Sequence, residues 1–267
     1  MRQHPQNGHP GKSQPRQGRV GATINVDATP GTPLTTRGLA VVLPAWNEEA
    51  VIEKTVREVV ERLRTLAPEY EVIVVDDGSQ DRTGEIADAL AAANPRIRVV
   101  HNRPNKGYGG ALIAGFNAVS KDLTFFMDAD GQFDIGEIGA LIEQIEEYDA
   151  VLGYRKHRQD PWPRLVNAWG WKLLMRLLFG LKVRDIDCAF KLYHTSLVRR
   201  ANVQAQGAMV NTEMLVKLSR LGYRWIEVPV GHYPRTDGKA SGANLRVILR
   251  AFKELLKLYW RIKHEPL

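Results

Sequence analysis

Residues 71–79 read Glu-Val-Ile-Val-Val-Asp-Asp-Gly-Ser, and residues 123–130 read Leu-Thr-Phe-Phe-Met-Asp-Ala-Asp. Each stretch is a short, largely apolar run that stops at a pair of carboxylates. Runs of this kind indicate strands that helices cover on both faces, as in a parallel sheet. Ligands bind beyond the carboxyl ends of strands in open α/β sheets, so the two acidic pairs mark the edge where we expect function.

Apolar runs and amphipathic stretches alternate on both sides of these two segments. The pattern predicts further strands over Leu39–Leu43, Ile97–His101 and Trp225–Val230. We expect helices that open at Asn47-Glu48, that follow the glycine-rich turn at 106–110, and that cover 83–93, 164–179, 212–220 and 244–264. This order is typical of an α/β domain with a mostly parallel central sheet flanked by helices.

The two ends of the chain differ in composition from its middle. Residues 1–37 are rich in Gly, Pro, Gln and Arg with almost no large apolar side chain, which predicts a disordered basic tail. Residues 38–243 carry the strand and helix pattern of one domain. Residues 244–267 predict an amphipathic basic helix. With 267 residues, 44% of them hydrophobic, the chain can bury a full core.

Positive charge gathers at both ends of a chain whose net charge is +7. Residues 1–38 hold five Lys/Arg against one Asp, and residues 244–267 hold six against two Glu. Nucleic-acid binding usually spreads basic residues over a folded face with stacking aromatics, so this distribution argues against nucleic acid and favours an anionic surface. The aromatic stretches 162–179 and 244–264 fit interfacial helices, although packing onto the domain or onto a partner is equally open.

The lack of a recognisable targeting signal and the single cysteine together predict a cytoplasmic protein. The sequence has no run of about eighteen apolar residues and no apolar signal-peptide region, so we expect a soluble or peripheral protein. The single cysteine, Cys188, excludes an intramolecular disulfide and fits a reducing compartment. We expect Cys188 to be a packing residue.

Asp128 and Asp130 offer two carboxylates one residue apart at a strand end. Mg²⁺ and Mn²⁺ prefer such hard oxygen ligands and keep positions open for substrate phosphates. Gln132 adds a neutral oxygen. An ordinary acidic loop is the alternative, because Asp and Gly are common turn residues.

Three segments, 44–49 (Pro-Ala-Trp-Asn-Glu-Glu), 75–79 and 126–130, occur in order and at fitting spacing. Together they resemble the family 2 glycosyltransferases with a GT-A fold, most closely the dolichol- or polyprenyl-phosphate sugar transferases, over about residues 39–245. The resemblance implies a nucleotide-sugar site lined by Pro44, Asn47, Glu48, Asp76, Asp77, Asp128 and Ala129. It also implies that Asp128, Asp130 and Gln132 hold the metal and the diphosphate.

Two more blocks resemble family motifs. Residues 106–112, Lys-Gly-Tyr-Gly-Gly-Ala-Leu, resemble Lys-Gly-x-Gly-x-Ala and imply that Lys106 belongs to the donor site, although a tight connection is the alternative. Residues 185–191 resemble Asp-x-x-Cys/Ser-Gly-Phe-Lys/Arg, with Ala189 in place of the usual glycine and Asp187 as an extra acid. The resemblance implies catalytic roles for Asp185 and Asp130. A surface salt bridge is the alternative for Asp185.

An anionic acceptor beside a diphosphate requires positive charge. Arg155, Arg164 and Arg235 resemble family arginines that engage the acceptor phosphate, and guanidinium groups suit phosphate recognition. Ordinary solvated arginines are the alternative for each.

The resemblance implies an inverting, metal-dependent enzyme. It would move mannose or glucose from a GDP- or UDP-hexose to a polyprenyl or dolichyl phosphate at the cytoplasmic face of a membrane. A phosphate acceptor is already anionic, so Asp185 would orient it, whereas a hydroxyl acceptor would require Asp185 as a base. Transfer to a soluble or polysaccharide hydroxyl, and a non-catalytic nucleotide-binding module, stay open as alternatives.

Overall fold

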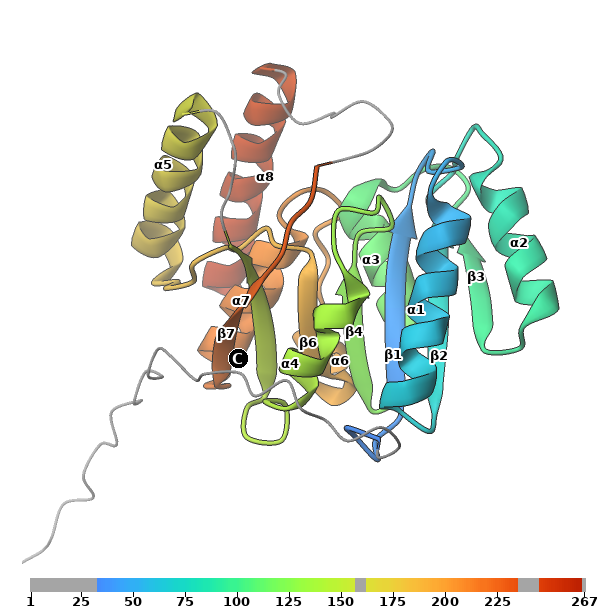
Figure 1. Cartoon of the computed structure of the whole chain (residues 1–267). Helices are drawn as coiled ribbons and strands as arrows, with labels where there is room; N and C mark the ends of the chain where they lie inside the picture. Colours follow the sequence, from blue (N-terminus) through green and yellow to red (C-terminus); the bar gives the residue numbers. More distant parts are fainter. Residues whose placement is uncertain (1–32, 157–161, 235–244, 266–267) are drawn as a thin grey trace, which may run out of the picture.

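A seven-stranded sheet forms the centre of the part of the chain that the structure describes (Figure 1). The computed structural model describes residues 33–156, 162–234 and 245–265, except for the side chains of 162–169 and 245–251. The strand order is β3-β2-β1-β4-β6-β5-β7. The strands are β1 (Leu39–Ala45), β2 (Tyr70–Asp76), β3 (Ile97–His101), β4 (Leu123–Met127), β5 (Ala150–Arg155), β6 (Phe190–His194) and β7 (Trp225–Val230).

The expected mostly parallel sheet is confirmed, with one reversal. Strands β1 to β4 pair in parallel, and β5 pairs in parallel with β7. Strand β6 is antiparallel to both of its neighbours, β4 and β5. Strands β5 and β6 were not expected from the sequence. Strand β6 is only five residues long and carries a charged side chain, Lys191, in its interior.

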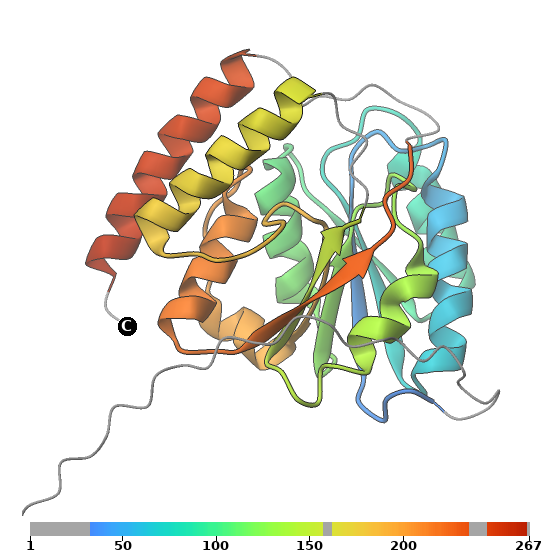
Figure 2. The ribbon, with the colours of Figure 1, turned by 60° about the vertical axis from the view of Figure 1, so that its left-hand side comes forward.

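Helices cover both faces of the sheet (Figures 1 and 2). Those on one face are α1 (Ile52–Leu66), α2 (Thr83–Ala93) and α4 (Ile138–Ile142), with the short η1 (Ile135–Glu137), and those on the other are α3 (Gly107–Ala118), α6 (Thr195–Ala201) and α7 (Val210–Arg220). Helices α5 (Trp162–Phe179) and α8 (Leu245–His264) lie side by side at the β7 end of the molecule. Within the described ranges, no helix is long and apolar enough to cross a membrane.

The core lies between the sheet and these helices. Every residue of β1 and β2 is buried, as expected for strands with helices on both faces. Helix α1 presents Ile52, Val56, Val59 and Leu63 to the core, and burial of each such side chain contributes about 1.5–3 kcal/mol. On the opposite face α3 approaches closely at Gly115, where an added Cβ would lie 2.3 Å from Val42 Cγ1.

The prediction that a helix opens at Asn47-Glu48 is wrong, because α1 begins at Ile52. Asn47 has a left-handed backbone with φ 56°, a conformation that Asn tolerates better than most residues. The backbone N–H of Asn47 donates to Ser79 Oγ in the loop after β2, and that of Glu48 donates to Thr83 Oγ1 at the start of α2. These contacts hold residues 46–51 as a loop at the sheet edge.

Candidate active site

The carboxyl ends of β1, β2 and β4 meet at one edge of the sheet, and the loops that follow them bring the candidate residues together. Pro44 itself is buried within β1, in register with Val75. The pairing of β1 with β4 has already ended at Val42, so the missing N–H of Pro44 leaves no gap in that ladder.

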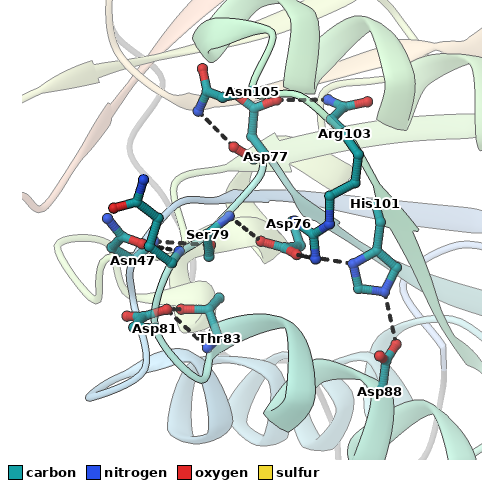
Figure 3. Close-up of polar contacts among 12 residues, drawn as sticks. Asn47, Asp76, Asp77, Ser79, Asp81, Thr83, Asp88, His101, Arg103 and Asn105 are labelled. Carbon is teal, nitrogen blue, oxygen red and sulfur yellow. Dashed lines mark hydrogen bonds and ion pairs between the residues drawn. The ribbon is translucent and has the colours of Figure 1, made fainter.

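Asp76 is fully buried and fixes the loop after β2 (Figure 3). Its Oδ1 accepts the Ser79 N–H at 3.0 Å, and its Oδ2 lies 2.9 Å from His101 Nδ1 and 3.2 Å from Arg103 Nη2. Burial alone would raise the pKa of Asp76, but the hydrogen bonds from Ser79 and His101 outweigh burial and lower that pKa. Both oxygens therefore hold protein partners, and Asp76 shapes the site.

Asp77 joins this loop to the glycine-rich turn. Its Oδ1 accepts from Asn102 Nδ2 at 2.8 Å and from the Lys106 N–H at 2.9 Å. Its carbonyl oxygen accepts from Asn105 Nδ2 at 2.6 Å. Asn47 completes the edge, because its Oδ1 accepts the Gln80 N–H at 2.8 Å. The expected donor-site residues Asn47, Asp77 and Lys106 thus lie in one network.

Asp128 and Asp130 flank Ala129 directly after β4. Asp128 Oδ1 is buried and has no hydrogen-bond partner among the described residues. Burial, followed by the charge of Asp130, raises the pKa of Asp128 to about 7, although a hydrogen bond from Tyr108 and the charges of Lys191 and Arg155 oppose this rise. Two carboxylates with one unsatisfied buried oxygen form a donor set that a hard cation would satisfy.

The residues around this pair are held by other parts of the chain. Ala129 is buried, and its carbonyl accepts from Thr55 Oγ1 of α1 at 3.2 Å. Asp130 Oδ1 accepts the Gln132 N–H at 3.1 Å. Gln132 Nε2 donates to the carbonyl oxygen of Tyr233 at 3.0 Å, and the Tyr233 N–H donates to the Gln132 carbonyl at 2.9 Å. The segment after β7 therefore lies against the loop at 128–132, where we expect the metal. The sequence did not predict this contact.

Asp185 and Arg155 form a bidentate ion pair. Arg155 Nε lies 2.7 Å from Asp185 Oδ2 and Nη2 lies 2.8 Å from Oδ1. The side chains are only 17% and 7% exposed, so the surface salt bridge considered for Asp185 does not describe this pair. Burial lowers the pKa of Arg155, but the hydrogen bond to Asp185 outweighs burial and raises it. Arg155 thus neutralises the carboxylate expected to be catalytic.

Lys191 is a buried cation whose role sequence reasoning missed. Its Nζ donates to the carbonyl oxygens of Ile186 and Cys188, and it lies 5.6 Å from the centre of the Phe126 ring. Burial lowers the pKa of Lys191. Its position at the end of the 185–191 motif was the available signal. Cys188 is fully buried, as expected for a packing residue, and burial raises its pKa to about 12.

The remaining candidates are not all described. Glu48 lies in the loop before α1, where its N–H donates to Thr83 Oγ1. The backbone of Arg164 belongs to α5, but its side chain lies outside the described residues. Arg235 also lies outside them.

The chain is similar in sequence to one protein family and to several known proteins. Residues 40–205 match the model of Glycosyl transferase family 2. The chain is 37% identical over 238 residues to Glycosyltransferase AglD of Haloferax volcanii, which covers 85% of this chain but only 38% of that protein. It is 32% identical over 211 residues to the undecaprenyl-phosphate mannosyltransferase of Micrococcus luteus, covering 75% of this chain and 85% of that protein.

Solved structures support the same fold. Glucosyl-3-phosphoglycerate synthase from Mycobacterium tuberculosis, crystallised with Mn²⁺ and UDP-glucose, aligns with a TM-score of 0.65 over 87% of this chain and 85% of that one, at 24% identity. The expected GT-A type of α/β fold is confirmed. With the match over residues 40–205, the chain belongs to the family 2 glycosyltransferases and is a glycosyltransferase.

Proposed function

We propose that this glycosyltransferase moves a hexose, mannose or glucose, from a nucleotide-sugar to a polyprenyl phosphate. The observation that carries the proposal is the Asp128–Asp130 pair, whose buried Asp128 Oδ1 is unsatisfied and whose environment includes the charge of Arg155. The relative from Micrococcus luteus, named an undecaprenyl-phosphate mannosyltransferase, supports a lipid phosphate as the acceptor. A GDP- or a UDP-hexose is the expected donor.

The cofactor we propose is Mg²⁺ or Mn²⁺, held by Asp128, Asp130 and Gln132. Within the described ranges no group of three or more His, Cys, Asp and Glu side chains is arranged so that it could hold a metal ion by itself. Two carboxylates leave coordination positions for diphosphate oxygens, which is how Mg²⁺ usually binds at phosphate-transfer sites. When bound, the ion would neutralise the leaving diphosphate. The synthase from Mycobacterium tuberculosis was crystallised with Mn²⁺ or Mg²⁺ and UDP.

The Arg155–Asp185 pair favours an anionic acceptor over a hydroxyl. A hydroxyl acceptor requires a base, and Asp185 in a bidentate pair with a guanidinium is a weak one. A phosphate oxygen carries its own negative charge and can accept from the same guanidinium. Asp185 then orients Arg155, and Arg164 and Arg235 remain proposed phosphate contacts.

Helices α5 and α8 offer a surface that suits a lipid bilayer. The two helices lie side by side (Figure 2). They contact each other through the ring pairs Trp171–Phe252 and Phe179–Tyr259. Large exposed apolar side chains remain on both helices: Leu173, Leu177, Phe252, Leu256 and Trp260. Exposed basic side chains accompany them: Lys172, Arg176, Lys253, Lys257 and Lys263. This mixture fits peripheral contact with anionic lipid headgroups, which we place at the cytoplasmic face.

Transfer of label tests the proposal. Purified protein would be incubated with Mn²⁺, a membrane lipid extract and a panel of labelled GDP- and UDP-hexoses. We expect label in the lipid fraction from one donor, and none from Asp130→Ala. Label that reaches only soluble glycan would contradict the polyprenyl phosphate acceptor and favour a hydroxyl acceptor.

A further inference from the structure

Glu213 of α7 is a fully buried acid outside the motifs described above. Its Oε2 accepts the N–H groups of Gln204 and Ala205 at 3.0 and 2.7 Å and lies 2.6 Å from Arg261 Nη2 of α8. Its Oε1 lies 3.1 Å from Lys217 Nζ, an ion pair without hydrogen-bond alignment. One carboxylate therefore ties together α7, α8 and the loop at 202–207.

The loop at 202–207 supports the glycine-rich turn that begins α3. The Gly110 N–H donates to the Gln206 carbonyl at 3.0 Å. A Cβ on Gly109 would lie 2.1 Å from the Ala205 carbonyl oxygen, and one on Gly107 would lie 3.0 Å from Gln206 O. Because these are backbone atoms, the turn and the loop cannot move independently.

The same glycine-rich turn contacts the donor-site acids that directly follow β2 and β4. The Lys106 N–H donates to Asp77 Oδ1 at 2.9 Å. The Tyr108 side chain lies close to those of Asp128 and Asn211. A continuous set of contacts therefore runs from α8 through Glu213 and the 202–207 loop to both acidic segments.

Helix α8 contacts this system at more than one point. Gly207 packs against Glu254, whose Oε2 would lie 2.2 Å from a Cβ added to the glycine. Lys217 Nζ lies 3.0 Å from Oε1 of Glu265, the residue directly after α8, and donates to the Asn202 carbonyl at 3.1 Å. The helix buries Leu255, Leu258 and Ile262. These contacts make α8 part of the support for the site.

We propose that Arg261 and Glu213 are positioning residues of the donor site. By fixing the 202–207 loop, they hold the glycine-rich turn where Lys106 and Tyr108 reach Asp77 and Asp128. The inference rests on the proposed donor site for its functional consequence. The structural link, by which α8 fixes the position of the glycine-rich turn, rests on the contacts alone and forms the mechanical part of the inference.

Hydrogen exchange in the unliganded full chain tests the mechanical part. Arg261→Met is compared with the charge-conserving Arg261→Lys, with Glu213→Gln, and with Lys257→Met as a control at an exposed position of the same helix. We expect Arg261→Met and Glu213→Gln to raise exchange about tenfold in peptides covering 107–116 and 202–208, with no further rise in the double variant, as for residues in one network. Arg261→Lys restores part of the protection, and Lys257→Met changes nothing.

Nucleotide binding tests the functional part. Titration of UDP and of GDP in the presence of Mn²⁺ should show binding weakened by about fivefold in Arg261→Met for whichever nucleotide the unmodified chain binds. Unchanged exchange over 107–116, or unchanged nucleotide affinity, overturns the inference. Failure of the unmodified chain to bind either nucleotide refutes the proposed function instead, and exchange then still decides the link to α8. Should Arg261→Met not fold, Arg261→Lys and Glu213→Gln carry the same comparison.

Discussion

Replacing Arg155 by methionine removes the guanidinium that forms a bidentate ion pair with Asp185, where both side chains are largely buried. The Arg155 side chain is 17% exposed and that of Asp185 is 7% exposed, and two hydrogen bonds of 2.7 and 2.8 Å join them. Removing one partner of a buried pair leaves a desolvated charge and typically costs about 3–5 kcal/mol. We take about 3 kcal/mol for Arg155→Met, because its partner retains the Arg155 backbone N–H at 3.3 Å.

Urea unfolding at neutral pH measures this cost. With a slope of about 2.5 kcal/mol per molar urea, a loss of about 3 kcal/mol lowers the midpoint by about 1.2 M. The control is Arg57→Met, which breaks an ion pair with Glu53 at 2.8 Å whose side chains are 66% and 56% exposed. Exposed pairs contribute about 0.2–1 kcal/mol, so this variant should stay near the unmodified chain.

The double variant Arg155→Met with Asp185→Asn shows whether the two residues stabilise the fold as a pair or independently of each other. Since the asparagine introduced by Asp185→Asn carries no charge, we expect the double variant to be destabilised by at least about 1 kcal/mol less than the sum of the single variants. Additive losses, or an Arg155→Met variant as stable as Arg57→Met, would refute the buried pair. Both single variants should also lose sugar transfer.

Three further predictions follow from other parts of the structure. Gly109→Ala should lower the free energy of unfolding by about 1–3 kcal/mol and weaken nucleotide binding, because the added Cβ meets the Ala205 carbonyl. Gly170→Ala, with open space around the glycine, should do neither. Equal stability of the two variants in urea would contradict the packing. The hydrogen bond to Asp76 raises the pKa of His101 in the folded protein. The stability that this contact contributes is therefore complete below the pKa of His101 in the unfolded chain, and it is lost as the pH rises through the pKa of His101 in the folded protein. Stability should therefore fall more between pH 6 and 8 in the unmodified chain than in His101→Gln, and equal pH profiles would argue against that contact. Leu256→Glu, at a side chain 60% exposed, should reduce flotation with anionic vesicles without changing thermal stability, and undiminished flotation would remove α8 from the membrane surface.

Much of the sheet and of its functional edge could be predicted from sequence. The interiors of β1, β2 and β4 are largely apolar because both faces are buried, and the acids after β2 and β4 stand out against them. Parallel pairing then brings the loops after Ala45, Asp76 and Met127 to one edge. Local pattern and strand direction were sufficient for this part.

Residues that depend on tertiary contacts could not be predicted in the same way. Asn47 and Glu48 resemble a helix start, but hydrogen bonds to Ser79 and Thr83, more than thirty positions away, hold them in a loop. The buried Glu213 pairs with Arg261, which lies on a different helix. Sequence spacing gives no sign of such contacts.

Binding of nucleoside diphosphate in the presence and absence of Mn²⁺ tests the metal-dependent donor site most directly. Asp130→Asn and Asp134→Asn each remove one charge while leaving an oxygen for the local N–H of Gln132 or Gly136. We expect the unmodified chain and Asp134→Asn to bind UDP or GDP tightly only with Mn²⁺, and Asp130→Asn to lose this metal dependence together with most of its affinity. Metal-dependent binding by Asp130→Asn equal to that of Asp134→Asn would contradict the proposed site.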